Sequence, residues 1–444
     1  MIGDASFMPP SRERIEAAGK IVIPGFVDPH IHFGLQGPMP EVKRVTRDFE
    51  LETRGAVHGG VTTCLLMLLD SDSPTSDTDE LIEWGNGHSF VDFGFVVLVR
   101  NREEIQAIDP LFEKGITTFK HFFTAFRKGQ AYVEDPTTPR YYGCDEGTFY
   151  ESLEHIQKLG PPALAMVHAE DSDLYNVFIP RARATGKNDL DIWESGRPPI
   201  CEFSRVEFAA QIDESTGCPL HYAHFSTARS VEILSRYLAK GVDLSAEVVP
   251  HTLTVTKHEW DEIGVWGKFV PPLRGSEEIN ALWQGVRAGT IRHITTDHCS
   301  LSCKEKEQGK GKFGSVWETP PGISNVHGHW LPILLTEGVR KGRITLQKMV
   351  EICSENNARR FGLYPKKGTI AVGSDADILI VDPSAEQLVD EGFYHGRSPE
   401  ISIHMGKRLI GKPWLTMIRG KTIVRDWKTV AESGWGKFVP SLRL

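Results

Sequence analysis

Six side chains that could bind metal ions or transfer protons lie at the ends of apolar, β-branched runs of the sequence. They are His30 and His32 in "FVDPHIHFG", Lys120 in "GITTFKHFF", His168 in "ALAMVHAE", His224 in "PLHYAHFS" and Asp297 in "RHITTDHCS". A pair of histidines one residue apart is weak evidence alone, because 17 histidines in 444 residues give roughly 0.65 such pairs by chance. A second pair, His327 and His329 in "VHGHW", illustrates this. The signal therefore comes from the whole set.

The residue types favour a site for two divalent cations. Neutral imidazoles and carboxylate oxygens suit zinc or manganese, whereas an ammonium group cannot be a ligand. Lys120 would therefore have to be carboxylated on its side-chain nitrogen, which would make it an anionic bridge between two cations that otherwise repel each other. Taken singly, each residue also fits a structural role: a hydrogen-bonded histidine, a lysine that reaches solvent, or an aspartate that caps a loop beside Thr295 and Thr296.

The elements that carry these residues predict a barrel. From about residue 22 to 300, eight β-rich runs alternate with helix-like stretches; they are "IVIPGFVDPHIH", "CLLMLL", "DFGFVVLV", "GITTFKHF", "ALAMVHAE", "PLHYAHFS", "DLSAEVVPH" and "RHITTDHCS". Eight such units predict an α/β fold, a (β/α)8 TIM barrel, whose chemistry occurs where the strands end. The intervals of 88, 48, 56 and 73 residues from His32 through Lys120, His168 and His224 to Asp297 place these residues on strands 1, 4, 5, 6 and 8.

A second unit follows the barrel. "GTIAVGSDADILIVDP", "ISIHMG" and "LTMIRGKTIVRDWKTV" are β-rich and punctuated by turns. We expect a small β-sandwich domain formed by the chain termini: residues 1–24 supply one or more strands, residues 25–366 form the barrel, and residues 367–444 form the rest of the sandwich and a tail.

Composition excludes several classes of function. Hydrophobic residues make up 40% and charged residues 25%, which is typical of a globular protein. The net charge of -9 and the lack of a basic patch argue against nucleic-acid binding; the Lys-rich run "KEKEQGKGK" at 304–312 is interpreted as a solvated loop. The apolar run at 61–69 is too short for a membrane span, and no secretion signal opens the chain, so a cytoplasmic protein is expected. Seven cysteines without CxxC spacing predict reduced thiols, with Cys299 and Cys303 poor candidates for ligands.

At these residues the sequence resembles the amidohydrolase superfamily, and within it the hydantoinase and dihydropyrimidinase family of cyclic amidohydrolases. The similar stretches include "GKIVIPGFVDPHIHFG", "MVHAED", "HYAHFST", "PPLR", "TTDHCS" and "KGRITLQKMVEICSENNARRFGLYPKKGTIAVGSDADILIVDP". The resemblance implies two zinc ions. His30, His32, carboxylated Lys120 and Asp297 would hold the inner ion, and His168, His224 and the carbamate the outer one. It also implies attack by a bridging hydroxide with Asp297 as general base and then acid, a small-molecule substrate, and a homodimer or homotetramer.

Three departures from the family pattern fall at expected substrate contacts. Phe126 stands where the family has a tyrosine that holds the oxyanion, so this task would fall to the metals or to Tyr141 or Tyr142. Val270 replaces a serine before "PPLR", and Trp317 and Glu318 precede "PPG" where the family has Pro-Asn-Gly. His251 in "VVPHTL" resembles a segment of dihydroorotases and allantoinases and is expected to have a supporting role.

Three functions follow from this pattern. The first is a metal-dependent hydrolase that opens a cyclic amide or imide such as a hydantoin or dihydropyrimidine. The second keeps the same centre but cleaves a linear amide, carbamate or urea in the altered pocket. The third is a non-enzymatic scaffold related to dihydropyrimidinase, against which the six filled ligand positions argue.

Overall fold

The computed structural model describes residues 13–35, 39–123 and 143–441, and its main body is a parallel β-barrel. Nine strands run in the order β10-β2-β3-β4-β5-β6-β7-β8-β9. Their bounds are β2 (Phe26–His32), β3 (Val61–Leu68), β4 (Asp92–Leu98), β5 (Thr118–Phe122), β6 (Leu164–His168), β7 (Leu220–Tyr222), β8 (Leu244–Val248), β9 (His293–Ile294) and β10 (His298–Cys299). Nearly every residue in them is buried, as expected of parallel strands covered on both faces.

The barrel closes at an interrupted eighth strand. β9 pairs with β8 and β10 pairs with β2, and only three residues separate β9 from β10. The N–H of Asp297, within this interruption, donates to the carbonyl oxygen of His30 at 2.8 Å. The sheet thus returns to its first strand, which confirms the predicted (β/α)8 barrel.

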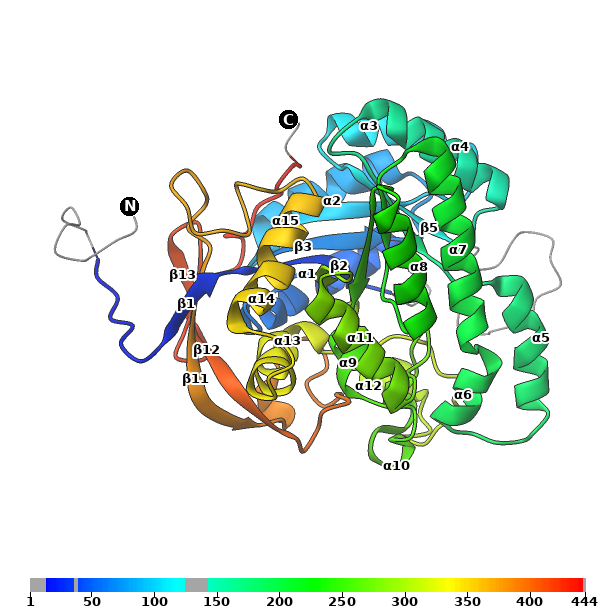
Figure 1. The fold of residues 1–444 in the computed structure, drawn as a ribbon. Helices are drawn as coiled ribbons and strands as arrows, with labels where there is room; N and C mark the ends of the chain where they lie inside the picture. Colours follow the sequence, from blue (N-terminus) through cyan, green and yellow to red (C-terminus); the bar gives the residue numbers. More distant parts are fainter. Residues whose placement is uncertain (1–12, 36–38, 124–142, 442–444) are drawn as a thin grey trace.

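Helices surround the barrel (Figure 1). They are α1 (Glu41–His58), α2 (Pro74–His88), α3 (Ile108–Glu113), α4 (Glu146–Leu159), α5 (Ser172–Arg183), α6 (Leu190–Gly196), α7 (Pro199–Thr216), α8 (Ala228–Ala239), α9 (Pro250–Thr254), α10 (Trp260–Ile263), α11 (Ser276–Ala288), α12 (Cys303–Glu307), α13 (Val326–Ile333), α14 (Leu346–Val350) and α15 (Asn356–Arg360). Short 3-10 turns occupy η2 (Glu104–Ala107), η3 (Gly264–Gly267) and η6 (Glu391–Phe393), and π-helical turns occupy η4 (Leu334–Arg340) and η5 (Glu351–Glu355).

Local sequence explains where these helices begin and end. In α4, the Asp145 side chain accepts a hydrogen bond from the Thr148 N–H at 2.6 Å, and Gly160 ends the helix with a positive φ of 69°. Within the described ranges, every helix is too short or too polar to span a membrane.

The chain ends form a second, antiparallel sheet beside α13 and α14 (Figure 1). Its order is β1 (Ile21–Pro24), β11 (Ile378–Leu388), β12 (Arg408–Ile418), β13 (Lys421–Arg425) and β14 (Lys428–Thr429). This agrees with a small β unit built from both termini, and in the described part of the chain it is one five-stranded sheet. The division of the domains at 24/25 and 366/367 stays a prediction.

Three details differ from the sequence-based expectation. The first predicted run is split, because Ile21–Pro24 pairs with β11 while Phe26–His32 enters the barrel. The prediction of a strand for "ISIHMG" was wrong. Residues 401–406 form a turn in which Ile401 and Ile403 are buried. The prediction of a solvated loop at 304–312 was also wrong in part. The first residues of this run belong to α12, and Lys306 is buried.

The C-terminal tail packs along its own barrel. The Phe438 ring lies 6.1 Å from those of Phe93 and Phe95, and the Lys437 N–H donates to Asp92 at 2.9 Å. All seven cysteines lie in the described ranges and none forms a disulfide, in keeping with the reduced thiols expected.

Candidate metal centre

The predicted ligands gather at one end of the barrel. His32 is the last residue of β2 and His168 the last of β6, while His224 follows β7 by two residues. Asp297 lies in the gap between β9 and β10, where it has a positive φ of 46°. Such backbone strain in a non-glycine residue is typical of functional sites, because the surrounding structure must impose it.

Asp297 faces three of the histidines. Its Oδ1 lies 3.2 Å from His30 Nε2 and 3.0 Å from His32 Nε2, and its Oδ2 lies 3.9 Å from His224 Nε2. His30, His224 and Asp297 each place a potential ligand atom within 4.8 Å of the others. The structure therefore brings together residues from the first, sixth and last strands of the barrel.

His168 and His224 form the other half of the cluster. Their ring centroids are 4.4 Å apart, and the His30 ring is 5.5 Å from that of His224. In the described part of the chain, the buried Nδ1 atom of His224 has no hydrogen-bond partner. Such an atom is available to a metal ion.

Lys120 is the third of the five residues of β5, so it lies inside the strand rather than at its end. Its side chain is fully buried, and its Nζ has no hydrogen-bond partner among the described residues. Burial lowers the pKa of Lys120 to about 8, and this fall is opposed by the nearby charges of Glu247 and Asp297. A buried ammonium without acceptors is costly, so the position fits a lysine that is chemically modified.

The protonation states of these side chains also favour the binding of cations. Burial lowers the pKa values of His32, His168 and His224, which favours the neutral imidazoles that metals require. Burial would raise the pKa of Asp297, but the neighbouring His30, His32 and His224 hold it below its ordinary value. The site thus pairs neutral rings with an ionised carboxylate.

Two carboxylates that support the histidines were missed by the sequence analysis. Glu247 of β8 accepts a hydrogen bond from His30 Nδ1 and lies 3.1 Å from His221 Nε2. Glu170 lies 2.8 Å from His168 Nε2 and 2.7 Å from an Arg197 nitrogen. A signal existed, because a glutamate inside the apolar run "DLSAEVVPH" has to find a buried partner.

Among the expected substrate contacts, Val270 is next in sequence to a residue that packs against this cluster. Val270 follows Phe269, whose ring meets the edges of the His224 and His251 rings at 5.8 and 4.2 Å. His251 is buried and both its ring nitrogens lack partners within the described ranges.

Trp317 and Glu318 contact residues outside the set of predicted ligands. The Trp317 ring packs 5.7 Å from that of Trp193, and the half-exposed Glu318 side chain pairs with Lys310. Phe126, Tyr141 and Tyr142 lie outside the described residues.

The second histidine pair from the sequence belongs elsewhere. His327 and His298 both approach one oxygen of Glu52, at 3.1 and 2.9 Å, and their rings stack 3.7 Å apart at 9°. Both ring nitrogens lie within hydrogen-bond distance of the same Glu52 oxygen, so this buried group forms a hydrogen-bonded cluster. His329 Nδ1 instead bonds to the Tyr394 hydroxyl at 2.7 Å.

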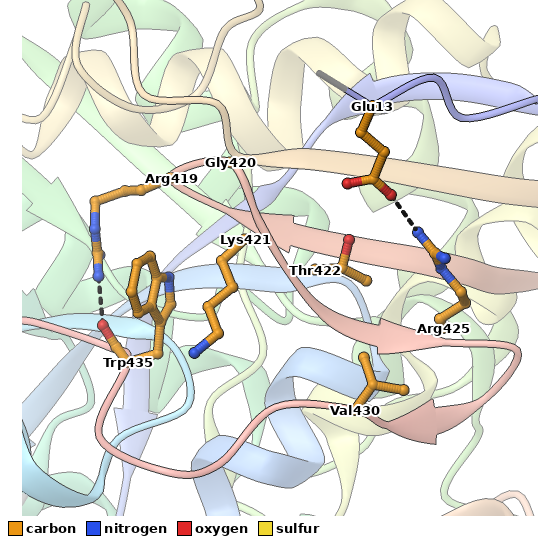
Figure 2. A pocket seen from close by; sticks show the side chains of 8 residues that line it. All are labelled: Glu13, Arg419, Gly420, Lys421, Thr422, Arg425, Val430 and Trp435. Carbon is orange, nitrogen blue, oxygen red and sulfur yellow. Dashed lines mark hydrogen bonds and ion pairs between the residues drawn. The ribbon is translucent and has the colours of Figure 1, made fainter. Parts of the chain in front are cut away.

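A hollow of about 570 Å³ lies on the small sheet, away from these ligands (Figure 2). Lys421 and Arg425 of β13 line it together with Trp435. Arg425 pairs there with Glu13 at 3.3 Å, and none of the six predicted ligands contributes to it.

Comparisons with known proteins agree with the fold and identify the family. The model of the amidohydrolase family matches residues 206–423. A D-hydantoinase of Geobacillus stearothermophilus is 34% identical over 441 residues, which cover 96% of this chain and 88% of the relative. The chain belongs to the amidohydrolase family. It is therefore a hydrolase, as the resemblance implied.

Other relatives of this amidohydrolase differ in their activities. An allantoinase of Rubrobacter xylanophilus is 32% identical over 97% of this chain and 89% of the relative. Among solved structures, an L-hydantoinase (dihydropyrimidinase) from Arthrobacter aurescens aligns with a TM-score of 0.88, 28% identity, and coverage of 98% of this chain and 92% of that one. The fold is therefore shared across relatives that are named for different substrates.

Proposed function

We propose that this amidohydrolase uses two divalent metal ions, zinc or manganese, to open a cyclic amide or imide ring such as a hydantoin or dihydropyrimidine. The observation that carries the proposal is the convergence of four histidines and Asp297 near the buried Lys120, whose Nζ has no hydrogen-bond partner among the described residues. Relatives named hydantoinase and allantoinase support the choice of a cyclic amide.

The described residues fit two ions. His30, His32, Lys120 and Asp297 would hold one, and His168, His224 and Lys120 the other, with Lys120 carboxylated. Its pKa of about 8 supports this modification, because the neutral amine is the form that adds to carbon dioxide. Addition of carbon dioxide to the neutral amine gives an anionic carbamate and releases one proton, and the ammonium form must lose another proton first.

When bound, the ions would supply a hydroxide nucleophile near neutral pH and polarise the substrate carbonyl. Asp297 is ionised and faces the cluster, so it can accept the proton released as the carbonyl carbon is attacked. It then donates this proton to the ring nitrogen as the carbon–nitrogen bond breaks. One water is consumed, and both parts of the ring remain in one product.

Mass spectrometry tests the reaction. Zinc- or manganese-loaded, bicarbonate-treated enzyme is incubated with a panel of cyclic imides and ureas beside linear amides and carbamates. A single product heavier by one water is expected from a cyclic substrate. Two fragments from a linear substrate, with no ring opened, would overturn the cyclic assignment but keep the metal site.

Two variants test the site itself. Lys120→Ala and Asp297→Asn are each expected to lower kcat/KM at least 1,000-fold, on the order of 4 kcal/mol of transition-state stabilisation. Metal analysis separates their roles, because Lys120→Ala removes the bridge and should release both ions, whereas Asp297→Asn alters one ligand of one ion and should retain the other. Full activity in both variants would exclude this centre as the site of hydrolysis.

A further inference from the structure

Lys306 is buried although it lies in the most lysine-rich run of the sequence. Its side chain leaves α12 and reaches three backbone carbonyl oxygens: those of Lys268 at 2.9 Å, Pro320 at 3.0 Å, and Gly322. An ammonium group has three N–H donors and no acceptor, so three carbonyls satisfy it fully. None of the functions described above uses this lysine.

A second buried lysine extends this contact. Lys268 Nζ donates to the carbonyl oxygen of Thr319 and lies 4.4 Å from the centroid of the Trp193 ring. Its own carbonyl accepts from both Lys306 and the N–H of Gly322, the latter at 3.1 Å. The two ammonium groups thus hold residues 319–322 against the chain at residue 268; we call this arrangement the lysine clamp.

The clamped segments border the metal centre. Residue 269 follows directly after Lys268, and its phenyl ring meets the edge of the His224 ring. On the other side, the carbonyl of Ile323 accepts from the N–H of Cys299 at 3.1 Å, two residues after Asp297. Gly322 has a φ of 122°, and an added Cβ there would lie 2.8 Å from Cys299 Sγ. The clamp therefore acts on backbone that packs closely against Cys299, two residues after Asp297.

We propose that Lys306 is a positioning residue that fixes the wall formed by residues 268–270 and 317–323 relative to Asp297, and so sets substrate affinity and selectivity. This inference rests on the proposed function. The reason is the loss of hydrogen bonds: without the Lys306 amino group, three buried carbonyls lose a donor, which costs more than the bonds themselves contribute. The segments would then relax away from each other while the metal ligands on the strands stay in place.

The test compares Lys306→Met with Lys304→Met, an exposed position on the same helix. For Lys306→Met we expect KM to rise at least tenfold, kcat per bound metal to change less than threefold, and the kcat/KM ratio between a small and a large ring substrate to shift. Lys304→Met should match the wild type. A purely structural role would lower the active fraction equally for all substrates, so an unchanged KM and ratio would overturn the proposal.

Hydrogen exchange gives a second readout that needs no activity. Peptides that cover residues 265–270 and 317–324 should exchange faster in Lys306→Met than in Lys304→Met, and unchanged exchange there would overturn the clamp. If Lys306→Met does not fold, Lys268→Met, which removes the donor to the Thr319 carbonyl, is judged by the same KM and exchange criteria. Absence of ring opening by the wild type would instead refute the proposed function, and the exchange comparison would still decide the clamp.

Discussion

At the scale of single residues, the chemistry depends on which nitrogen of each histidine faces the centre. Glu247 accepts a hydrogen bond from His30 Nδ1, which leaves His30 Nε2 directed at Asp297. Glu170 orients His168 from the other side of the barrel. Carboxylates in this position fix the tautomer and make the imidazole a better ligand.

Glu247→Gln is therefore expected to weaken metal binding about 10- to 100-fold, because an amide cannot accept from both His30 and His221 as a carboxylate does. The measurement is metal content after dialysis against increasing chelator concentrations. Glu151→Gln, which alters only an exposed pair with Arg102, is the control. Equal metal retention in both variants would show that Glu247 does not support the centre.

At the scale of elements, the helices contain buried groups whose charge depends on pH. Asp213 lies near the C-terminal end of α7, and neither of its carboxylate oxygens has a hydrogen-bond partner in the described ranges. Burial raises its pKa to about 8; Arg360 opposes the rise and Asp243 adds to it. The folded state therefore prefers the protonated carboxyl.

The sign of the pH dependence follows. Since the pKa of Asp213 is higher in the folded chain than its ordinary 3.8, the stability that it contributes is complete below about pH 4 and is lost as the pH rises through 8. An asparagine at this position cannot ionise. The free energy of unfolding of Asp213→Asn relative to the wild type should therefore rise between pH 4 and pH 8, on the order of a few kcal/mol. Chemical unfolding at several pH values measures it, with Glu214→Gln on the exposed side of α7 as the control. A difference between wild type and Asp213→Asn that stays constant with pH would contradict the expectation.

At the scale of the whole molecule, a buried ionic cluster joins the barrel to the small sheet. Lys367 contacts Asp92 of β4 and, at 2.8 Å, Asp377 just before β11, and Arg419 after β12 also pairs with Asp92. Lys367 and Asp92 are both fully buried. Charges without access to water need these partners to be tolerated at all.

Lys367→Met should leave buried carboxylates uncompensated and destabilise the protein by about 3–5 kcal/mol. Urea unfolding measures the loss, and Lys366→Met, a less buried neighbour for which no ion pair is found in the described residues, should change stability by less than about 0.5 kcal/mol. If the two variants unfolded at the same urea concentration, the cluster would not be what holds the two units together.

Much of the fold was predictable because its signals are local. Apolar runs with β-branched residues predicted the barrel strands. The six candidate ligands were found because residue type and position at a strand's end are both visible in the chain. Their assignment to metal ions stays a prediction, to which the geometry gives support.

The contacts between distant segments depend on the tertiary structure. His30 and Glu247 are 217 residues apart in the sequence, and Lys306 and Lys268 are 38 residues apart. No periodicity in the sequence connects the members of either pair. The lysine-rich run at 304–312 was interpreted as solvated because charge usually lies in water; the carbonyls that bury Lys306 come from other parts of the chain. Which elements form could be predicted from the sequence, since helices and strands depend largely on neighbouring residues. The chemical groups that each element carries are also visible in the sequence. Barrel closure decided which groups meet, because it brings the first strand against the last.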